Sequence, residues 1–427
     1  MTTQPRILLL TAYYFPFQGG VETHARALAG FLVSAGFSVS IVTRQVDRTS
    51  PRRELLEGVP VHRVWPRGPR TGIRKLLMLP SAILEILRLR RTFDVIYCPG
   101  YQGIGVAALL CGKLLGRPVI LRSGNLGVLY GNNWDAPLAR WRIDPDIAIV
   151  RWLKARARRM YMSADALVCN CRDIEREALD CGMPRDRVHY LPNGVDLQQY
   201  HPASAAERTD VRAEEGWPEN TLVCVYLGRL SVEKGVLDLL QAWRTVARPE
   251  RLLVLVGPDM TGNALDAGPA ARAFVARHGL ESVVRFHGPC VSPARLLRGA
   301  DLYTQPSHYE AFSNAVIEAM ATGLPLVASR VGGMLDCIDD EQNGLLCNPA
   351  DSTDLARQLS RLVDDAPIRE RLGRQARDRV ANDFDKTIIF RRFADLFVAV
   401  ARSGSATRER PPEAGAPRES PDANVRA

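Results

Sequence analysis

Short unbroken runs of apolar residues, each followed by a stretch with helical spacing, recur along the whole chain and limit the folds it can adopt. In the first half these runs occupy 6–12, 38–43, 61–65, 94–98, 118–122, 166–170 and 188–192. A strand covered by helices on both faces is apolar throughout instead of alternating, as in a parallel sheet. The alternation of such strands with helices predicts a doubly wound α/β domain over residues 1–195.

A polar stretch with two prolines interrupts this rhythm at 196–220, which is predicted to be an interdomain linker with a short helix. Apolar runs resume at 222–227, 252–256, 283–287, 301–305, 325–329 and 344–347. These runs predict a second α/β domain over 221–383. Helical spacing of large apolar residues predicts a last helix at 384–402. The tail 403–427, rich in Pro, Glu, Arg and Ser, is expected to be disordered.

The composition excludes several classes of protein. Of the 427 residues, 46% are apolar and 24% are charged, as in average globular domains, which excludes a largely disordered, collagen-like or repeat-dominated chain. No run approaches the roughly 20 apolar residues that span a bilayer, and the run at 7–10 is too short for a signal peptide. Nine cysteines, an odd number without paired spacing, are typical of reduced thiols. We therefore expect a cytoplasmic protein.

Two tandem domains of this kind would share a ligand-binding cleft, because ligands bind outside the carboxyl ends of parallel strands. The segment 228–235, Gly-Arg-Leu-Ser-Val-Glu-Lys-Gly, follows a predicted strand and opens a helix. Arg229 offers a planar fork of donors, Lys234 offers a mobile point charge, and the helix start offers free N–H groups. These groups suit a phosphate-bearing ligand. The alternative is a solvated loop with ordinary surface charges.

A second group of candidate residues follows the predicted strand at 301–305. Glu310 lies in the next loop, and Glu318 lies inside a helix predicted from about 313 to 323. A carboxylate among apolar neighbours is costly to bury without hydrogen bonds, which sugar and ribose hydroxyls would supply. The unpaired N–H groups of 312–314 at the helix start would suit a diphosphate. Alternatively, Glu310 is a first-turn acid favoured by the helix dipole, and Glu318 pairs with a nearby Arg.

Five short motifs stand in order along the chain. They are Gly19-Gly20-Val21-Glu22-x-His24, Pro192-Asn193-Gly194-Val195-Asp196, Gly228-Arg229-Leu230-Ser231-x-x-Lys234-Gly235, Glu310-x7-Glu318, and Gly332-Gly333 followed by Asn343-Gly344-Leu345. From residue 6 to 401 the chain resembles the retaining GT-B glycosyltransferases of the group one or family four type. The resemblance implies two Rossmann-like domains facing a central cleft, and a final helix that crosses back to the N-terminal domain.

The resemblance also implies roles for individual residues. Arg229 and Lys234 would neutralise the diphosphate of a nucleotide-diphospho-sugar donor, Glu310 would hold the transferred sugar, and Glu318 the ribose. The implied donor site comprises Gly19, Gly20, Arg229, Lys234, Glu310, Ala311, Phe312, Ser313, Asn314 and Glu318, of which Glu310, Arg229 and Lys234 are the expected catalytic residues. The donor is a co-substrate, and we expect no cofactor, because the fixed cations stabilise the leaving group.

The chain departs from the family pattern where many members carry a His in the middle of the N-terminal domain. The corresponding segment here is Leu121-Arg122-Ser123-Gly124-Asn125, which has no His. Arg122, Ser123 and Asn125 are therefore candidates for contacts with the acceptor or the sugar. His24, on the first predicted helix, is a further candidate; the favoured alternative is that it is only a packed or solvent-facing side chain.

Two other patterns could suggest a metal ion. Asp144 and Asp146 form a D-x-D pattern, but they lie among basic residues and not at the end of an apolar strand. Cys169, Cys171 and Cys181 lack the spacing typical of zinc sites. The sequence therefore predicts no metal site.

Two segments account for the net charge of +9. Residues 74–91 contain five Lys or Arg and one Glu, which gives +4, and residues 140–159 contain seven Lys or Arg and two Asp, which gives +5. Both segments mix these cations with large apolar side chains, a composition that favours anionic membrane surfaces. Docking on the cytoplasmic leaflet would give access to a lipid-linked acceptor. Two solvated basic helix faces are the alternative, and no nucleic-acid partner is expected.

The leading functional prediction is a retaining, metal-independent hexosyltransferase that acts on a saccharide or lipid-linked acceptor in surface glycan or glycolipid synthesis. Two alternatives stay open. One is a non-catalytic nucleotide-sugar-binding protein, which the missing His supports. The other is a GT-B enzyme that uses the same site for epimerisation or phosphorolysis of a nucleotide sugar.

Overall fold

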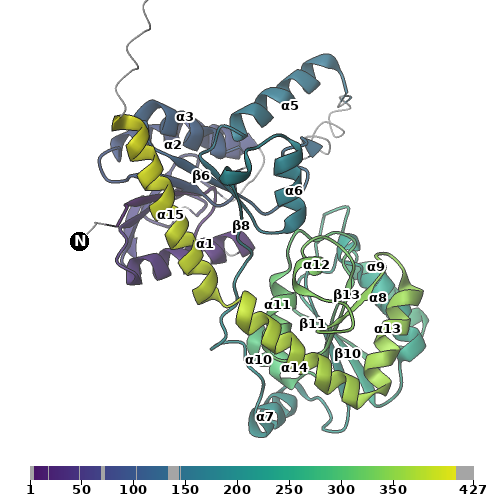
Figure 1. Ribbon diagram of the computed structural model, residues 1–427. Coiled ribbons are helices and arrows are strands. Elements are labelled where there is room, and N and C mark those ends of the chain that lie inside the picture. The colour runs from purple at the N-terminus through teal and green to yellow at the C-terminus, as the bar shows by residue number, and fades with distance from the viewer. Residues whose placement is uncertain are drawn as a thin grey trace, which may run out of the picture.

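The computed structural model describes residues 4–409 apart from 18, 48, 69–72, 102, 133–143 and 145. Figure 1 shows two lobes, each a sheet covered by helices, which meet at a narrow waist. The architecture of two parallel-sheet α/β domains predicted from the apolar runs is confirmed.

The N-terminal domain has an eight-stranded sheet in the order β3-β4-β2-β1-β5-β6-β7-β8. Its strands are β1 (Ile7–Leu10), β2 (Val39–Arg44), β3 (Arg53–Leu56), β4 (Val59–Val64), β5 (Val95–Cys98), β6 (Val119–Ser123), β7 (Ala166–Cys169) and β8 (Val188–Tyr190). Its helices are α1 (Gly20–Ser34), α2 (Ile73–Arg88), α3 (Gly105–Leu115), α5 (Ala148–Tyr161) and α6 (Arg172–Asp180), with a 3-10 turn at Arg185–Arg187. Neighbouring strands are parallel except β3 and β4, which are antiparallel.

The C-terminal domain has a six-stranded parallel sheet in the order β11-β10-β9-β12-β13-β14. Its strands are β9 (Leu222–Leu227), β10 (Arg251–Val256), β11 (Val284–Gly288), β12 (Leu302–Gln305), β13 (Leu326–Ser329) and β14 (Leu345–Cys347). The helices after β9 are α8 (Val236–Val246), α9 (Gly268–Arg277), α10 (Pro293–Gly299), α11 (Asn314–Ala321), α12 (Met334–Cys337), α13 (Ser352–Asp364) and α14 (Ala366–Asp383), with a 3-10 turn at Val232–Lys234.

The segment expected to be a linker, 196–220, packs onto the C-terminal domain. It contains the expected short helix, α7 (Ala205–Glu215), which begins with a capping box at Ser204. The Arg212 side chain, 1% exposed, forms an ion pair with Asp301 at the start of β12, and Trp217 is buried in the same core. Polar composition therefore marked a domain boundary here, but the buried ion pair attaches the segment to one side.

The chain crosses between the domains twice, and the two crossings lie side by side. The backbone N–H of Val195 donates to the carbonyl of Phe384, and the N–H of Lys386 donates to the carbonyl of Val195. The last helix, α15 (Lys386–Glu409), then packs on α1 and β5 of the N-terminal domain through Phe390, Phe393 and Phe397 (Figure 1). It continues beyond residue 402, into the segment expected to be a tail, and the rest of that tail, 410–427, lies outside the described residues.

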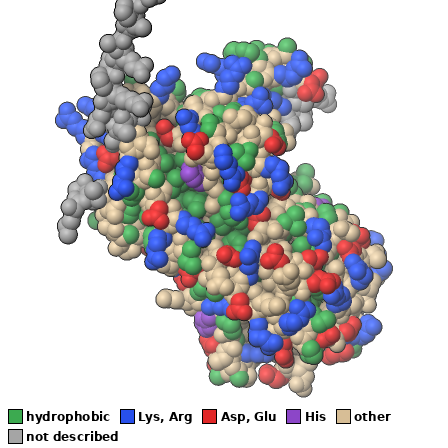
Figure 2. Space-filling view, viewed as in Figure 1, with side chains coloured by type: hydrophobic (Ala, Val, Ile, Leu, Met, Phe, Trp, Pro, Cys, Tyr) green, Lys and Arg blue, Asp and Glu red, His purple; other side chains and the backbone are tan. Residues whose placement is uncertain are grey.

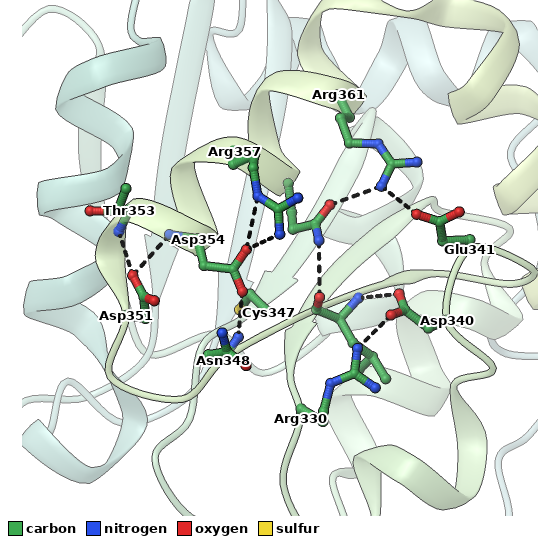
Figure 3. Close-up of polar contacts among 12 residues, drawn as sticks. Arg330, Asp340, Glu341, Cys347, Asn348, Asp351, Thr353, Asp354, Arg357 and Arg361 are labelled. Atoms are coloured by element: carbon green, nitrogen blue, oxygen red, sulfur yellow. Dashed lines mark hydrogen bonds and ion pairs between the residues drawn. The ribbon is translucent and has the colours of Figure 1, made fainter.

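Polar side chains tie the outer strand of the C-terminal sheet to α13 and the preceding turn (Figure 3). The Asp340 carboxylate accepts from the backbone N–H of Leu346 at 2.9 Å and pairs with Arg330 at 2.5 Å. Arg361 of α13 donates to Glu341 at 2.8 Å. These contacts hold the turn that contains the Asn343-Gly344-Leu345 motif. The motif therefore has a structural role, at the outer edge of the C-terminal sheet.

Candidate functional site

A pocket of about 270 Å³ lies between the two domains. The N-terminal domain and the first crossing contribute Gly20, Val21, Arg122, Gly124, Asn170 and Asn193, and the C-terminal domain contributes Leu227, Gly228, Lys234, Gln305, Glu310, Phe312, Ser313, Asn314 and Ala315. These residues follow the carboxyl ends of several parallel strands, where such folds bind ligands. The pocket joins motifs that are far apart in the sequence.

Lys234 is brought into the pocket by the tight turn that precedes α8. Gly235 has a φ of 69°, and a Cβ atom there would lie 1.9 Å from the carbonyl oxygen of Pro306. Only glycine allows this close approach of two backbones. As a result the ammonium group of Lys234 reaches the Glu310 carboxylate and forms an ion pair with it. The two side chains are 17% and 14% exposed, so the pair is largely withdrawn from solvent.

Glu310 is held in turn by the Gly332-Gly333 motif. A Cβ atom on Gly332 would lie 1.9 Å from the carbonyl oxygen of Glu310, and one on Gly333 would lie 2.3 Å from that of Ala311. The N–H of Gly333 donates to the Ala311 carbonyl at 2.9 Å. This motif therefore supports the acidic loop from behind and does not itself line the pocket.

The N-terminus of α11 points its first residues at the pocket. Ser313 is the N-cap, and its hydroxyl accepts from the N–H of Val316 at 3.4 Å. Asn314 and Ala315, in the first turn, line the pocket. The first N–H groups of a helix have no partner inside the helix and carry a partial positive charge. With Lys234, they make this wall suitable for an anion.

Four of the ten predicted donor-binding residues, Gly19, Arg229, Ala311 and Glu318, lie outside the lining of this pocket. Arg229 is 50% exposed and pairs with Glu233 at 2.7 Å. Glu318 lies on α11 beside Tyr200, whose hydroxyl hydrogen-bonds to its carboxylate. Desolvation by burial raises the pKa of Glu318 to about 7. A buried carboxyl of this kind suits hydrogen bonding to hydroxyl groups better than pairing with a cation.

The predicted acceptor residues do not converge on the pocket. Arg122 lines it and is 2% exposed. The Ser123 hydroxyl instead donates to the Asn125 carbonyl at 3.1 Å, and the Asn125 side chain is exposed. His24 is 8% exposed and packs against Phe390 and Phe393 of α15. Burial lowers the pKa of His24 well below its usual value, so the structure matches the packed alternative for this residue.

Several contacts at the site could not be predicted from the motifs alone. The Asn193 side chain accepts from Arg122 and donates to the Asn314 side chain at 2.6 Å, which links the two domains. The N–H of Leu126 donates to the Tyr309 hydroxyl at 3.0 Å, again across the domains. The sequence could have identified Asn193 as a site residue, because it belongs to the Pro192-Asn193-Gly194 motif. Leu126 and Tyr309 carry no comparable sequence signal.

Groups that could bind metal do not gather in the part of the chain that the structure describes: no three His, Cys, Asp or Glu side chains come together there. All nine cysteines are free thiols, and most are buried. Asp144 and Asp146 are described, but the segment beside them is not.

Comparisons with known proteins agree with this geometry. Residues 18–199 match the family model described as Glycosyltransferase Family 4, and residues 207–379 match the one described as Glycosyl transferases group 1. A D-inositol 3-phosphate glycosyltransferase of Arthrobacter sp. (strain FB24) is 30% identical over 402 residues, which is 88% of this chain and 91% of the relative. That of Stackebrandtia nassauensis is 31% identical over 389 residues, which is 85% and 83% of the two chains.

Solved structures show the same fold. Sucrose-phosphate synthase from Thermosynechococcus elongatus superposes with a TM-score of 0.75 at 22% identity, over 93% of this chain and all of that one. Anabaena HepE in complex with UDP-glucose gives a TM-score of 0.73 at 19% identity, over 92% of this chain and all of that one. The fold and its interdomain pocket define a protein of the GT-B class. The chain belongs to the group 1 (family 4) glycosyltransferases, as its motifs predicted.

Proposed function

We propose that this glycosyltransferase moves a hexose from a nucleotide-diphospho-sugar to a saccharide or lipid-linked acceptor, with retention of anomeric configuration, in surface glycan or glycolipid synthesis. The observation that carries the proposal is the pocket where Lys234, Glu310 and the start of α11 meet Gly20 of the other domain. The fold neighbour with UDP-glucose bound supports a donor of this class, and the relatives named D-inositol 3-phosphate glycosyltransferases support glycosyl transfer.

The chemistry follows from where charge develops. Breaking a glycosyl–diphosphate bond leaves negative charge on the departing diphosphate, and fixed cations aimed at that charge stabilise the transition state. Lys234 and the N–H groups at the start of α11 would face the diphosphate, and Arg229 would join them by turning away from Glu233. Glu310 would hold hydroxyls of the transferred sugar, and Glu318 would hold the ribose.

Retention needs no protein nucleophile in this proposal. The acceptor hydroxyl attacks on the face from which the diphosphate leaves, and a diphosphate oxygen takes its proton. The new glycosidic bond forms as the bond to the diphosphate breaks, so the leaving nucleoside diphosphate carries the proton away. Because Lys234 and α11 neutralise the leaving group, no metal ion is required.

A donor screen tests this proposal. UDP-, GDP- and ADP-sugars are incubated with the protein and D-inositol 3-phosphate or a lipid-linked sugar, with and without EDTA, and nucleotide release is measured. We expect acceptor-dependent release with one nucleotide class, unchanged by EDTA, and a product with the anomeric configuration of the donor. Tight nucleotide binding without acceptor-dependent release would support the non-catalytic alternative instead. An inverted product would contradict retention.

The outer side of the N-terminal domain supports a peripheral position on the cytoplasmic face of a membrane. Helix α5 projects from this domain (Figure 1), and Lys and Arg side chains gather on the projection (Figure 2). Ile149, Trp152 and Leu153 on α5 are 58%, 59% and 39% exposed, between basic residues of the same helix. Such a helix binds anionic lipid surfaces by burying its apolar face beside the headgroups. Within the described residues, no helix is long and apolar enough to cross a bilayer.

In the predicted basic segment 74–91, one of the cations is held in an ion pair on its own helix. Arg88 donates to Glu85, which is 6% exposed and also pairs with Arg53 and His62. A liposome test should therefore target α5. We expect a Trp152→Ser/Leu153→Ser variant to lose binding to anionic vesicles, whereas Leu265→Ser/Val291→Ser in the C-terminal domain keeps it. Equal binding of both variants to these vesicles would contradict the membrane proposal.

A further inference from the structure

Arg122 is a buried cation in the interdomain pocket that no family motif assigns. Arg122 is only 2% exposed, yet it lines the pocket together with Lys234 and Glu310. Its guanidinium donates a hydrogen bond to the neutral amide of Asn193. Among the described residues Arg122 makes no ion pair, and its Nε has no hydrogen-bond partner. Two other buried arginines pair with carboxylates: Arg212 pairs with Asp301, and Arg63 pairs with Glu54.

The groups around Arg122 do not neutralise it. The His24 ring and the Tyr97 phenol lie close enough for its charge to act on them, and burial lowers the pKa of His24. Burial likewise lowers the pKa of Arg122 itself, because desolvation disfavours the charged guanidinium. His24 Nε2, the Tyr97 hydroxyl and Asn170 Oδ1 are also buried without partners among the described residues. Polar atoms left in this state are rare in folded proteins.

A charge buried without a counterion lowers the stability of the fold. Folded proteins retain such a charge where a ligand supplies the opposite charge. The other cation of the pocket, Lys234, already has its carboxylate, so Arg122 leaves the pocket with one positive charge in excess. We propose that Arg122 is the phosphate-binding residue of the N-terminal domain, which meets from one wall the anion that Lys234 and α11 meet from the other. This inference rests on the proposed function for the statement that the anion is a nucleotide diphosphate.

The position of Arg122 also links anion binding to the domain interface. Its hydrogen bond to Asn193 continues to Asn314, the first residue of α11. A phosphate held between Arg122 and the start of α11 would therefore contact both domains, which the Asn193–Asn314 hydrogen bond also links. A planar guanidinium can also donate two parallel hydrogen bonds to one phosphate, which an ammonium group cannot.

Isothermal titration of the full chain tests the inference, with UDP, GDP and ADP as probes and the matching nucleosides as phosphate-free controls. For the nucleotide that binds wild type, we expect Arg122→Gln and Arg122→Met to bind at least tenfold more weakly. Arg122→Lys, which keeps the charge but not the fork, should fall between. Affinity for the nucleoside should not change. Unchanged diphosphate affinity in both neutral variants, together with unchanged phosphate binding in the measurement below, would overturn the inference.

The phosphate could belong to the donor or to the acceptor, and inorganic phosphate distinguishes the two sources. If Arg122 holds the donor's diphosphate, phosphate should compete with the nucleotide and fail to bind the saturated complex. If Arg122 holds a phosphate of the acceptor, phosphate should bind the saturated complex of wild type and not that of Arg122→Gln. Either result supports a phosphate-binding Arg122. If no nucleotide binds wild type, the proposed function fails. The role of Arg122 is still tested in that case by comparing the binding of inorganic phosphate to wild type and to Arg122→Gln.

Thermal unfolding separates this role from a structural one. Because Arg122→Gln and Arg122→Met remove an unpaired buried charge, both should unfold at the wild-type temperature or above it. Phosphate should raise the unfolding temperature of wild type and have no such effect on either variant. A purely structural arginine behaves in the opposite way, so a clear loss of stability in both neutral variants would overturn the proposal.

Discussion

The two walls of the interdomain pocket carry cations in opposite ways. On the C-terminal wall, Lys234 is paired with Glu310, and the Gly332-Gly333 turn supports that carboxylate from behind. On the N-terminal wall, Arg122 has an amide partner but no carboxylate partner among the described residues. The first arrangement holds a charged group in place before a ligand arrives, and the second leaves a charge for the ligand to neutralise. One anion site can therefore combine a half that is stable without ligand and a half that costs stability until the ligand binds.

The strongest way to break the C-terminal wall is Lys234→Ala. We expect kcat/KM to fall about a hundredfold, ~2.7 kcal/mol of transition-state stabilisation, because the leaving group loses a fixed cation and Glu310 is left buried without its partner. Steady-state nucleotide release measures the effect. Lys113→Ala, an exposed lysine on α3, is the matched control and should act as wild type. Turnover by Lys234→Ala at the wild-type rate would remove this wall from the active site.

A second test concerns stability on the C-terminal side, at Glu318. Its folded pKa is raised to about 7, above the usual 4.5. Between these two pKa values the folded state keeps a proton on Glu318 that the unfolded state has released. The stabilisation from this proton is fully present below pH 4.5 and is lost as the pH rises to about 7. Glu318→Gln keeps the shape and removes the charge. Urea unfolding should show it more stable than wild type by ~2 kcal/mol at pH 8, and nearly equal at pH 4.5. A difference that does not change with pH would contradict this assignment.

Glu310→Gln weakens the C-terminal wall without removing its cation. The amide still hydrogen-bonds to sugar hydroxyls but no longer pairs with Lys234, so the ammonium loses its fixed position. We expect kcat/KM to fall about tenfold, ~1.4 kcal/mol. Glu57→Gln, which removes an exposed partner of Arg26 in the other domain, is the control. If Glu310→Gln lost more activity than Lys234→Ala, the carboxylate would have a role beyond positioning that cation.

The sequence predicted most strands because those strands are buried on both faces. Strand β3 was missed for the opposite physical reason: it lies at the edge of the sheet, pairs antiparallel with β4, and alternates exposed and partly exposed residues. The 196–220 segment was read as a linker from its polarity, which does not reveal that Arg212 is buried against Asp301. The local pattern of apolar residues thus predicts which helices and strands are buried. It does not predict the ion pairs between distant residues that attach a polar segment to one domain.

The same limit applies to the site. The motifs predicted Lys234, Glu310 and the start of α11, because each lies within a short segment with its own signal. They could not show that Arg229 pairs with Glu233, that His24 packs under α15, or that Asn193 joins Arg122 to Asn314. Those contacts depend on how separate segments meet in three dimensions. The two sides of the comparison therefore differ in predictability as well as in charge.

The smallest effect is expected from the hydrogen bond that joins the two walls of the pocket. Asn193→Ala and Asn314→Ala each remove one side of the 2.6 Å hydrogen bond between the domains. We expect each to lower kcat/KM about threefold, and the double variant to lower it by little more than either, which is a coupling of ~0.7 kcal/mol. A double-mutant cycle on nucleotide release measures this coupling. Strictly additive effects would mean that the two walls act independently, and that Arg122 reaches α11 only through the ligand.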